Sequence, residues 1–141
     1  MGRILALDLG RKRCGVAVTD PLQLIANGLT VVSPSLLDNF LSQYFDSEQV
    51  DEIVVGNPRR LDGQQSESWQ YISPILNRLR TRFPSIPFIL FDERFTSTLA
   101  HKAMIEGGMK KSHRQIKDNA DIMAATILLN DYLETKKYKM S

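Results

Sequence analysis

The sequence predicts an α/β domain built on a mixed five-stranded sheet with helices on both faces. Apolar segments at residues 4–9, 13–20 and 28–33 follow one another closely, as in an antiparallel meander. Amphipathic helical segments then alternate with short apolar strands, which is typical of parallel sheets. The length of 141 residues and the apolar share of 43% suit one domain, residues 1–141, with one core.

The first three strands come from the first quarter of the chain. Residues 4–9 form an apolar strand that Asp8 interrupts, and only residues 10–12 separate it from the strand at 13–20. A connection this short predicts an antiparallel hairpin. Ser35, after the third strand, can cap a helix over about 36–46, where apolar residues recur at helical spacing.

The rest of the chain alternates strands with helices. The predicted segments are a strand at 51–56, helix at 65–82, strand at 88–91, helix to about residue 106, basic loop at 107–114 and helix at about 113–135. Pro74 lies inside the second helix, so it must either kink that helix or begin a new one. Residues 136–141 are expected to fray.

Charge and cysteine content exclude several classes of protein. Lys and Arg number 18 against 16 Asp and Glu, a formal net charge of +2 that is too balanced for a disordered tail. The single cysteine, Cys14, excludes a disulfide framework and a cysteine-based zinc site. No apolar run approaches the roughly 20 residues that a membrane helix needs. Without an export signal at the start, we expect a cytoplasmic protein with no membrane partner.

Basic residues gather in three segments: residues 11–13, residues 59–60 and residues 101–117. If the three segments converged on one face, they would suit a polyanion such as a nucleic acid. The alternative is that each is a solvated loop, and the sequence alone does not decide between the two.

Several acidic residues lie in or at the ends of apolar core segments, where burial of an unpaired charge is unfavourable. Asp8 interrupts the first strand, Asp92 and Glu93 end the strand at 88–91, and Asp118 and Asp121 share one face of the last helix. Carboxylates that met in one pocket would favour Mg²⁺ or Mn²⁺ over zinc. Two such ions about 4 Å apart support phosphodiester hydrolysis. Each acid has an alternative explanation. Asp8 could cap the hairpin, Asp92 and Glu93 could pair with Arg94 at the strand end, and Asp121 could lie on a solvated face of its helix.

Four segments in order resemble the YqgF/RuvX family of Holliday-junction-resolvase-like proteins. They are residues 8–20 (DLGRKRCGVAVTD), 54–58 (VVGNP) followed by 62–63 (DG), 92–97 (DERFTS) and 118–125 (DNADIMAA). The resemblance extends over essentially the whole chain. It departs at Asn57, where the family usually has an apolar residue, and at Cys14, where it usually has a β-branched one.

The resemblance implies an RNase H-like fold and a divalent-metal-dependent nuclease that matures the 5′ end of pre-16S ribosomal RNA in the cytoplasm. It implies Asp8, Glu93 and Asp121 as catalytic ligands of Mg²⁺ or Mn²⁺, with Asp92 as the rival to Glu93 and Asp118 as a weaker candidate. The expected nucleic-acid-binding residues are Arg11, Lys12, Arg13, Arg59, Arg60, Arg94, Lys110, Lys111 and Arg114.

Other functions stay open. A resolvase of branched DNA and a non-catalytic nucleic-acid-binding factor in ribosome assembly or transcription would use the same residues. An ATPase is disfavoured because the first hairpin carries basic residues instead of phosphate-binding hydroxyls. The sequence also leaves open whether the protein is a monomer or a homodimer, and whether it cuts as an endonuclease or an exonuclease.

Overall fold

The computed structural model describes residues 2–57, 66–92 and 113–140, and the side chains of the last segment only over residues 118–136. Its elements are β1 (Arg3–Leu9), β2 (Cys14–Thr19), β3 (Ala26–Val32), a 3-10 turn (Pro34–Leu36), α1 (Leu37–Ser47), β4 (Val50–Asn57), α2 (Trp69–Arg82), β5 (Phe88–Asp92) and α4 (His113–Met140). The helix predicted near residues 96–106 lies outside the described residues.

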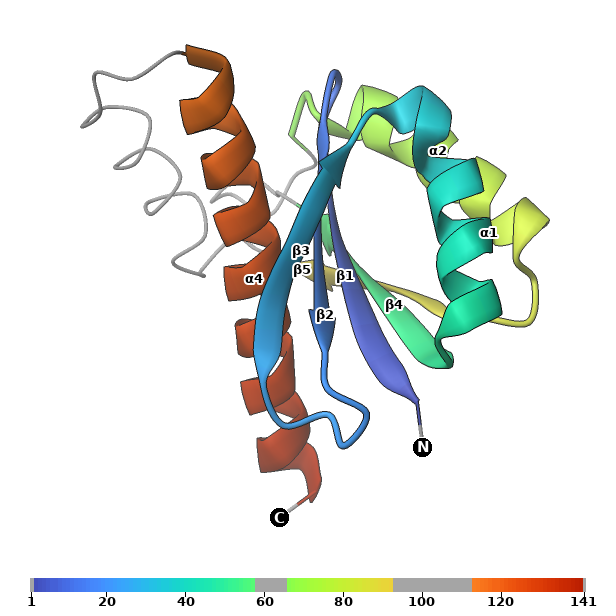
Figure 1. The fold of residues 1–141 in the computed structure, drawn as a ribbon, viewed down its shortest axis with the longest axis vertical. Coiled ribbons are helices and arrows are strands. Elements are labelled where there is room, and N and C mark those ends of the chain that lie inside the picture. Colours follow the sequence, from blue (N-terminus) through green and yellow to red (C-terminus); the bar gives the residue numbers. More distant parts are fainter. Residues whose placement is uncertain (1, 58–65, 93–112, 141) are drawn as a thin grey trace.

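The five strands form one mixed sheet in the order β3-β2-β1-β4-β5. β1 pairs antiparallel with β2 and parallel with β4, while the outer pairs are antiparallel β2–β3 and parallel β4–β5. Helices α1 and α2 cover one face, and α4 crosses the other (Figure 1). The predicted mixed five-stranded sheet with helices on both faces is therefore confirmed.

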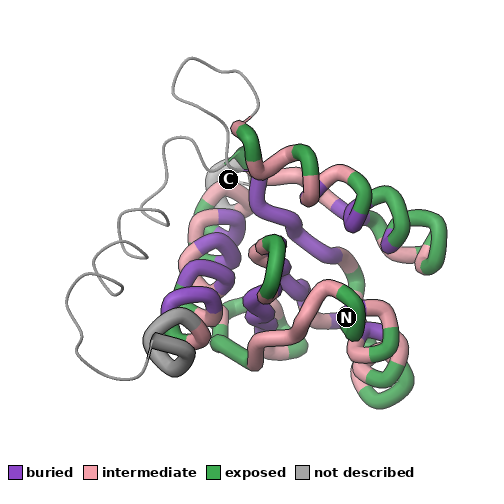
Figure 2. Tube along the Cα trace, turned by 90° about the horizontal axis from the view of Figure 1, so that it is seen from above, coloured by how far each residue is buried: buried purple, intermediate pink, exposed green. Residues whose placement is uncertain are grey.

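Strand alternation divides the core into two layers. Leu5, Leu7 and Leu9 of β1 pack in the layer beneath α1 and α2. Ile4 and Ala6 pack in the layer beneath α4. Figure 2 shows the buried positions on the strands and on the inner sides of the helices. Asp8 shares the parity of Ile4 and Ala6, so its position belongs to the α4 face.

Glycine and alanine residues let α4 lie very close to the sheet. A β-carbon on Gly15 of β2 would overlap the backbone carbonyl of Asp121, and one on Gly28 of β3 would lie 2.5 Å from Cγ2 of Ile122. On the helix side, Ala120, Ala124 and Ala125 are all buried. This close approach brings the first turns of the described part of α4 to the strands that carry Asp8 and Gly15.

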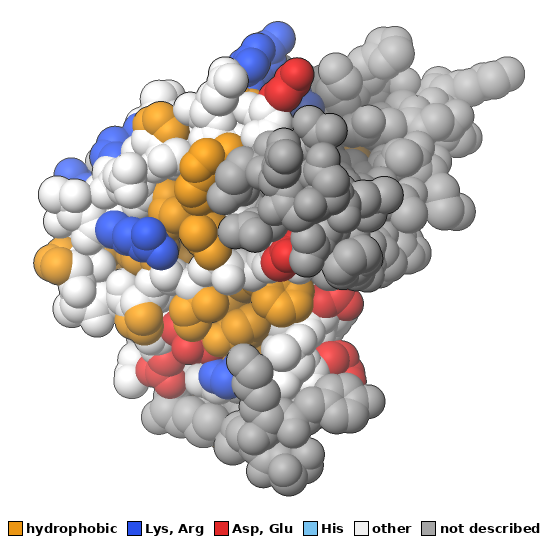
Figure 3. Space-filling view, turned by 180° about the vertical axis from the view of Figure 1, so that it is seen from behind, with side chains coloured by type: hydrophobic (Ala, Val, Ile, Leu, Met, Phe, Trp, Pro, Cys, Tyr) orange, Lys and Arg blue, Asp and Glu red, His pale blue; other side chains and the backbone are white. Residues whose placement is uncertain are grey.

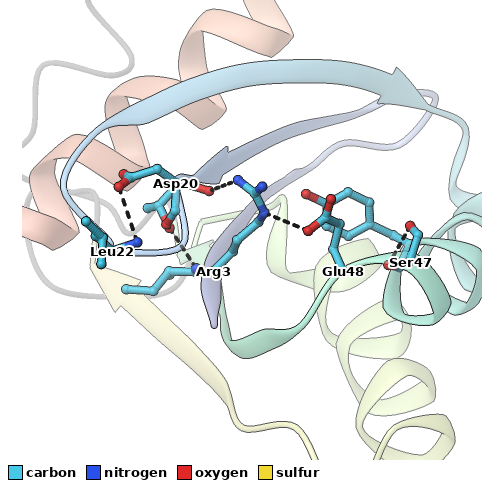
Figure 4. A network of polar contacts seen from close by, with 8 residues as sticks. Arg3, Asp20, Leu22, Ser47 and Glu48 are labelled. Atoms are coloured by element: carbon cyan, nitrogen blue, oxygen red, sulfur yellow. Dashed lines mark hydrogen bonds and ion pairs between the residues drawn. The ribbon is translucent and has the colours of Figure 1, made fainter. Parts of the chain in front are cut away.

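The loop between β2 and β3 is held by polar groups at the opposite end of the sheet from Asp8. The Asp20 carboxylate accepts hydrogen bonds from the backbone N–H groups of Leu22, Leu24 and Ile25. Arg3 donates to the carbonyl of Thr19 and forms an ion pair with Glu48 (Figure 4). The backbone hydrogen bonds lower the pKa of Asp20. These contacts fix the ends of β1 and β2 away from the candidate site.

Two local predictions need correction, and one alternative is decided. Ser35 does not cap α1: it lies in the 3-10 turn, and Leu36 at the N-cap makes no side-chain cap hydrogen bond. Of the two alternatives for Pro74, the start of a new helix is excluded, because one helix runs over Trp69–Arg82 with Pro74 inside it. The last helix continues to Met140, although a frayed tail was expected from residue 136.

The extension of α4 has a visible cause. Lys136 donates a 2.9 Å hydrogen bond to Glu52 of β4, and the Tyr132 hydroxyl donates to the same carboxylate at 2.8 Å. Tertiary contacts therefore hold a segment whose local sequence does not favour order. No helix in the described ranges is long and apolar enough to cross a bilayer.

Candidate active site

Asp8 lies one residue from the end of β1 and is partly exposed. Its backbone pairs with Gly15 of β2 in the antiparallel register. Because its neighbours of equal parity pack beneath α4, its position lies on the α4 face of the sheet. A carboxylate at the end of a core strand on this face stands beside the first described turns of α4.

Asp121 reaches the same place from the helix. Its side chain is only 5% exposed, and its backbone carbonyl lies against Gly15. Gly15 thus touches Asp121 through space and pairs with Asp8 through the sheet. The structure therefore brings together two of the three carboxylates that the sequence predicts as catalytic.

Arg13, which precedes β2, supplies the positive charge beside Asp121. Its Nε donates a 2.7 Å hydrogen bond to Oδ2 of Asp121. The same Nε lies 3.8 Å from Oδ1 of Asp118, one helical turn earlier. Arg13 was expected to contact nucleic acid, but in this structure its guanidinium pairs with the acidic residues. Asp118, the weaker ligand candidate, lies next to this pair.

The ionisation of Cys14 reflects the same cluster of charges. The pKa of the Cys14 thiol is raised from 9.0 to about 11, mainly by burial; the negative charges of Asp8 and Asp121 contribute to the rise, while a backbone hydrogen bond with Gly10 and the charge of Arg78 oppose it. A thiol with this pKa stays protonated at neutral pH. Cys14 is therefore a buried, protonated side chain of β2.

Asp92 occupies a different position from Asp8 and Asp121. Along β5, Phe88 and Leu90 pack with the α1/α2 layer, and Ile89 and Phe91 pack with the α4 layer. Asp92 has the parity of Phe88 and Leu90, so its register position belongs to the α1/α2 face, opposite Asn57 of β4. Glu93, its rival, lies outside the described residues.

The donor set fits a hard divalent cation. Asp8 and Asp121 offer carboxylate oxygens, which Mg²⁺ and Mn²⁺ prefer, and Mg²⁺ commonly uses one or two carboxylates with waters and phosphates in its other positions. Over residues 2–57, 66–92 and 118–136, no group of three or more His, Cys, Asp or Glu side chains comes together. The described residues therefore supply two members of the predicted triad.

The basic residues divide into those that the structure describes and those that it does not. Arg11 and Lys12 are exposed in the hairpin between β1 and β2, and the Arg11 guanidinium lies 5.4 Å above the ring of Tyr71. The remaining predicted contacts lie outside the described residues or have undescribed side chains: Arg59, Arg60, Arg94, Lys110, Lys111 and Arg114. On the face in Figure 3, described Lys and Arg side chains are scattered.

Sequence reasoning assigned no contact to Tyr71 or Asn57. Tyr71 supports Arg11 from α2, and the only sequence signal was an aromatic residue near the start of an amphipathic helix. Asn57 is 4% exposed, and its Oδ1 has no hydrogen-bond partner in the part of the chain that is described. Its signal was the departure from an apolar family position, at the end of β4 beside Asp92.

Comparison with known proteins gives consistent results. A family model described as "RuvX: Holliday junction resolvase" matches residues 2–135. A protein of Phocaeicola vulgatus named "Putative pre-16S rRNA nuclease" is 53% identical over 138 residues, covering 98% of this chain and 99% of the relative. A Parabacteroides distasonis protein of the same name is 49% identical over 140 residues, covering 99% and 100%.

A solved structure shares the fold at low sequence identity. Thermus thermophilus RuvC in complex with a Holliday junction substrate superposes with a TM-score of 0.56 and 15% identity, covering 96% of both chains. At this identity the likeness shows the fold alone. It confirms the predicted fold class.

Proposed function

The chain belongs to the RuvX family of Holliday junction resolvase-like proteins, and from this premise we propose that it is a nuclease that processes the 5′ end of pre-16S ribosomal RNA. Such an enzyme is a hydrolase acting on ester bonds, and its substrate is a nucleic acid. The observation that carries the proposal is that Asp8 and Asp121 both adjoin Gly15: Asp8 pairs with it across the sheet, and the backbone carbonyl of Asp121 lies against it. Relatives at 53% and 49% identity bear the name of such a nuclease.

We assign the metal site to Asp8, Asp121 and Glu93, with Mg²⁺ or Mn²⁺ as the cofactor. Bound divalent ions activate a water and stabilise the leaving oxygen in phosphodiester hydrolysis. The parity of β5 supports Glu93 over Asp92, because Asp92 has the register of the face away from Asp8. Asp118 is better explained as a neighbour of Arg13 than as a ligand.

The protein's own residues prepare the site before any substrate arrives. The close contact at Gly15 fixes the backbone of Asp121, and Arg13 orients its carboxylate. Arg11 and Lys12 stand in the adjacent hairpin, where exposed cations can hold backbone phosphates of the substrate. The undescribed basic residues, Arg59, Arg60, Arg94, Lys110, Lys111 and Arg114, would extend this contact. With ribosomal RNA as substrate, the protein would work in the cytoplasm.

Cleavage of two labelled substrates side by side tests the proposal. Precursor ribosomal RNA and a four-way DNA junction are incubated with the wild type, with Asp8→Asn and with Asp46→Asn, in Mg²⁺ and in Mn²⁺. Asp46 is an exposed acid on α1, away from the site, and serves as the matched control. We expect RNA cleavage that Asp8→Asn abolishes and Asp46→Asn retains, with unchanged circular dichroism.

The other outcomes separate the alternatives. Because the family description names a Holliday junction resolvase, cleavage of the junction alone would assign the enzyme to branched DNA. Binding without cleavage of either substrate would favour an assembly factor. Equal cleavage by Asp8→Asn and the wild type would refute the assigned site.

A further inference from the structure

Arg13 is placed between two carboxylates of unequal exposure. Its side chain is 31% exposed, that of Asp121 is 5% exposed and that of Asp118 is 38% exposed. Nε of Arg13 is 2.7 Å from Oδ2 of Asp121 and 3.8 Å from Oδ1 of Asp118. A single guanidinium therefore pairs closely with a buried acid while a second, solvated acid stands within reach.

The buried acid needs a cation. A carboxylate removed from water is destabilised in its charged form unless an opposite charge or hydrogen bonds compensate. Asp8 has the parity of the same face of the sheet and pairs with Gly15, which the backbone of Asp121 contacts, so it adds a second negative charge nearby. In this structure, Arg13 supplies a compensating charge to Asp121.

A divalent cation at Asp8 and Asp121 would compete with Arg13 for the same carboxylate. Two cations on one carboxylate repel each other, and the repulsion is strong in a partly desolvated site. The backbone of Asp121 cannot retreat, because its carbonyl is packed against Gly15. Arg13 can, because it extends from the short hairpin connection between β1 and β2 and is partly exposed.

Asp118 provides a place for the displaced guanidinium. It lies one turn before Asp121 on the same face of α4, nearer to solvent. A small rotation of the Arg13 side chain would exchange the buried partner for the exposed one without moving the backbone. The pairing would then be weaker, since exposed ion pairs contribute little, and the guanidinium would be available to a phosphate group.

We propose that Arg13 is a positioning residue that neutralises Asp121 in the metal-free protein and moves toward Asp118 when a divalent cation binds at Asp8 and Asp121. The inference rests on the proposed metal site of the nuclease. It assigns Asp118 the role of receiving Arg13 and not that of a metal ligand. Metal loading and phosphate binding are thereby linked through one side chain.

Mn²⁺ affinity, measured by the electron paramagnetic resonance of the free ion, tests the exchange on the full chain. Arg13→Ala removes the competitor, so we expect Mn²⁺ to bind about tenfold more tightly than to the wild type. Asp118→Asn removes the receiving carboxylate, so we expect binding about threefold weaker. The double variant Arg13→Ala/Asp118→Asn should bind as tightly as Arg13→Ala alone, because Asp118 acts only through Arg13.

Urea unfolding gives a second readout. Without metal, Arg13→Ala should be less stable than the wild type, and saturating Mn²⁺ should remove most of that difference because the metal replaces the lost cation. Arg13→Lys keeps a positive charge and should stay close to the wild type in both measurements. It also serves if Arg13→Ala does not fold.

Three outcomes would overturn the inference: unchanged or weaker Mn²⁺ binding by Arg13→Ala, binding by the double variant that is weaker than that of Arg13→Ala, or unchanged binding by Asp118→Asn. The second would identify Asp118 as a ligand. Failure of the proposed metal site of the nuclease is recognised separately, because Asp8→Asn would then bind Mn²⁺ with wild-type affinity.

Discussion

The backbone carbonyl of Asp121 lies so close to the α-carbon of Gly15 that a β-carbon on residue 15 would overlap it. One predicted catalytic residue is thus positioned through a contact of its main chain with a strand, independently of its side chain. The same strand residue pairs with Asp8, so a single glycine sets the separation between the two acids.

Gly15→Ala should destabilise the fold strongly, because the neighbour of the added methyl group is backbone and cannot rotate away. We expect a loss of about 3 kcal/mol in the free energy of unfolding. Gly28→Ala is the matched control, because its β-carbon would meet the side chains of Ile122 and Thr126, which can adjust. It should cost about 1 kcal/mol. Urea denaturation followed by circular dichroism gives both values, and equal losses would contradict the proposed difference.

Cys14 should make stability depend on alkaline pH. Its thiol has a pKa of about 11 in the folded protein against 9.0 as the ordinary value, with burial as the main cause. A raised folded pKa means that the unfolded chain releases its proton first, so the stabilisation is complete below pH 9 and is lost as the pH rises toward 11. Unfolding free energies measured across this window should fall for the wild type.

The Cys14→Ala variant isolates that contribution. Burial and Glu52 also raise the pKa of Tyr132, so some alkaline destabilisation should persist in the variant. The fall between pH 9 and pH 11 should nevertheless be smaller than in the wild type. Thiol titration adds a direct check, since the folded wild type should react slowly with iodoacetamide at neutral pH and rapidly in urea.

Asn57→Val should raise stability by about 1 kcal/mol, because it removes a buried oxygen that lacks a hydrogen-bond partner among the described residues. Valine also suits a strand position better than asparagine. Thermal and urea unfolding measure the change, and RNA cleavage is assayed in parallel. Lower stability of the variant would show that Oδ1 is satisfied in solution. A more stable variant with reduced cleavage would give Asn57 a role in substrate binding.

Lys12→Ala should weaken RNA binding and reduce its dependence on salt. If Lys12 holds one phosphate, the slope of log K against log salt should fall by about one unit. Arg82→Ala is the control, because Arg82 is exposed near the end of α2, and its guanidinium lies over the ring of Phe83. Filter binding at several salt concentrations gives both slopes. An unchanged slope for Lys12→Ala would remove the hairpin from the interface.

The sequence predicted the elements better than the contacts between them. Apolar alternation was enough for the strands and for the β1–β2 hairpin, because these depend on neighbouring residues. The Arg13–Asp121 ion pair joins residues 108 positions apart and depends on how α4 crosses the sheet. Neither the basic segment at residues 11–13 nor the segment at residues 118–125 indicated that Arg13 and Asp121 would meet.

Local rules failed where packing opposed them. Ser35 is a favourable cap residue, yet the chain enters α1 through a 3-10 turn. Lys136 belonged to a stretch predicted to fray, yet its ion pair with Glu52 holds it on β4. The sequence left Asp92 and Glu93 as rivals, and the face to which the position of Asp92 belongs became readable only when Phe88 and Ile89 were seen in different layers.

The two-layered packing of β1 also determines how the protein can change over generations. Leu5 and Leu7 pack in the layer beneath α1 and α2, whereas Ala6 packs beneath α4, the helix that carries Asp121, and Asp8 has the parity of that face. Odd positions in this strand can therefore drift among apolar residues of similar volume while the reacting groups stay where they are. Ala6 has no such freedom, since a bulkier residue there would push α4 away. Substitutions that affect thermal stability and substitutions that affect the chemistry should therefore fall at alternate positions of this seven-residue strand.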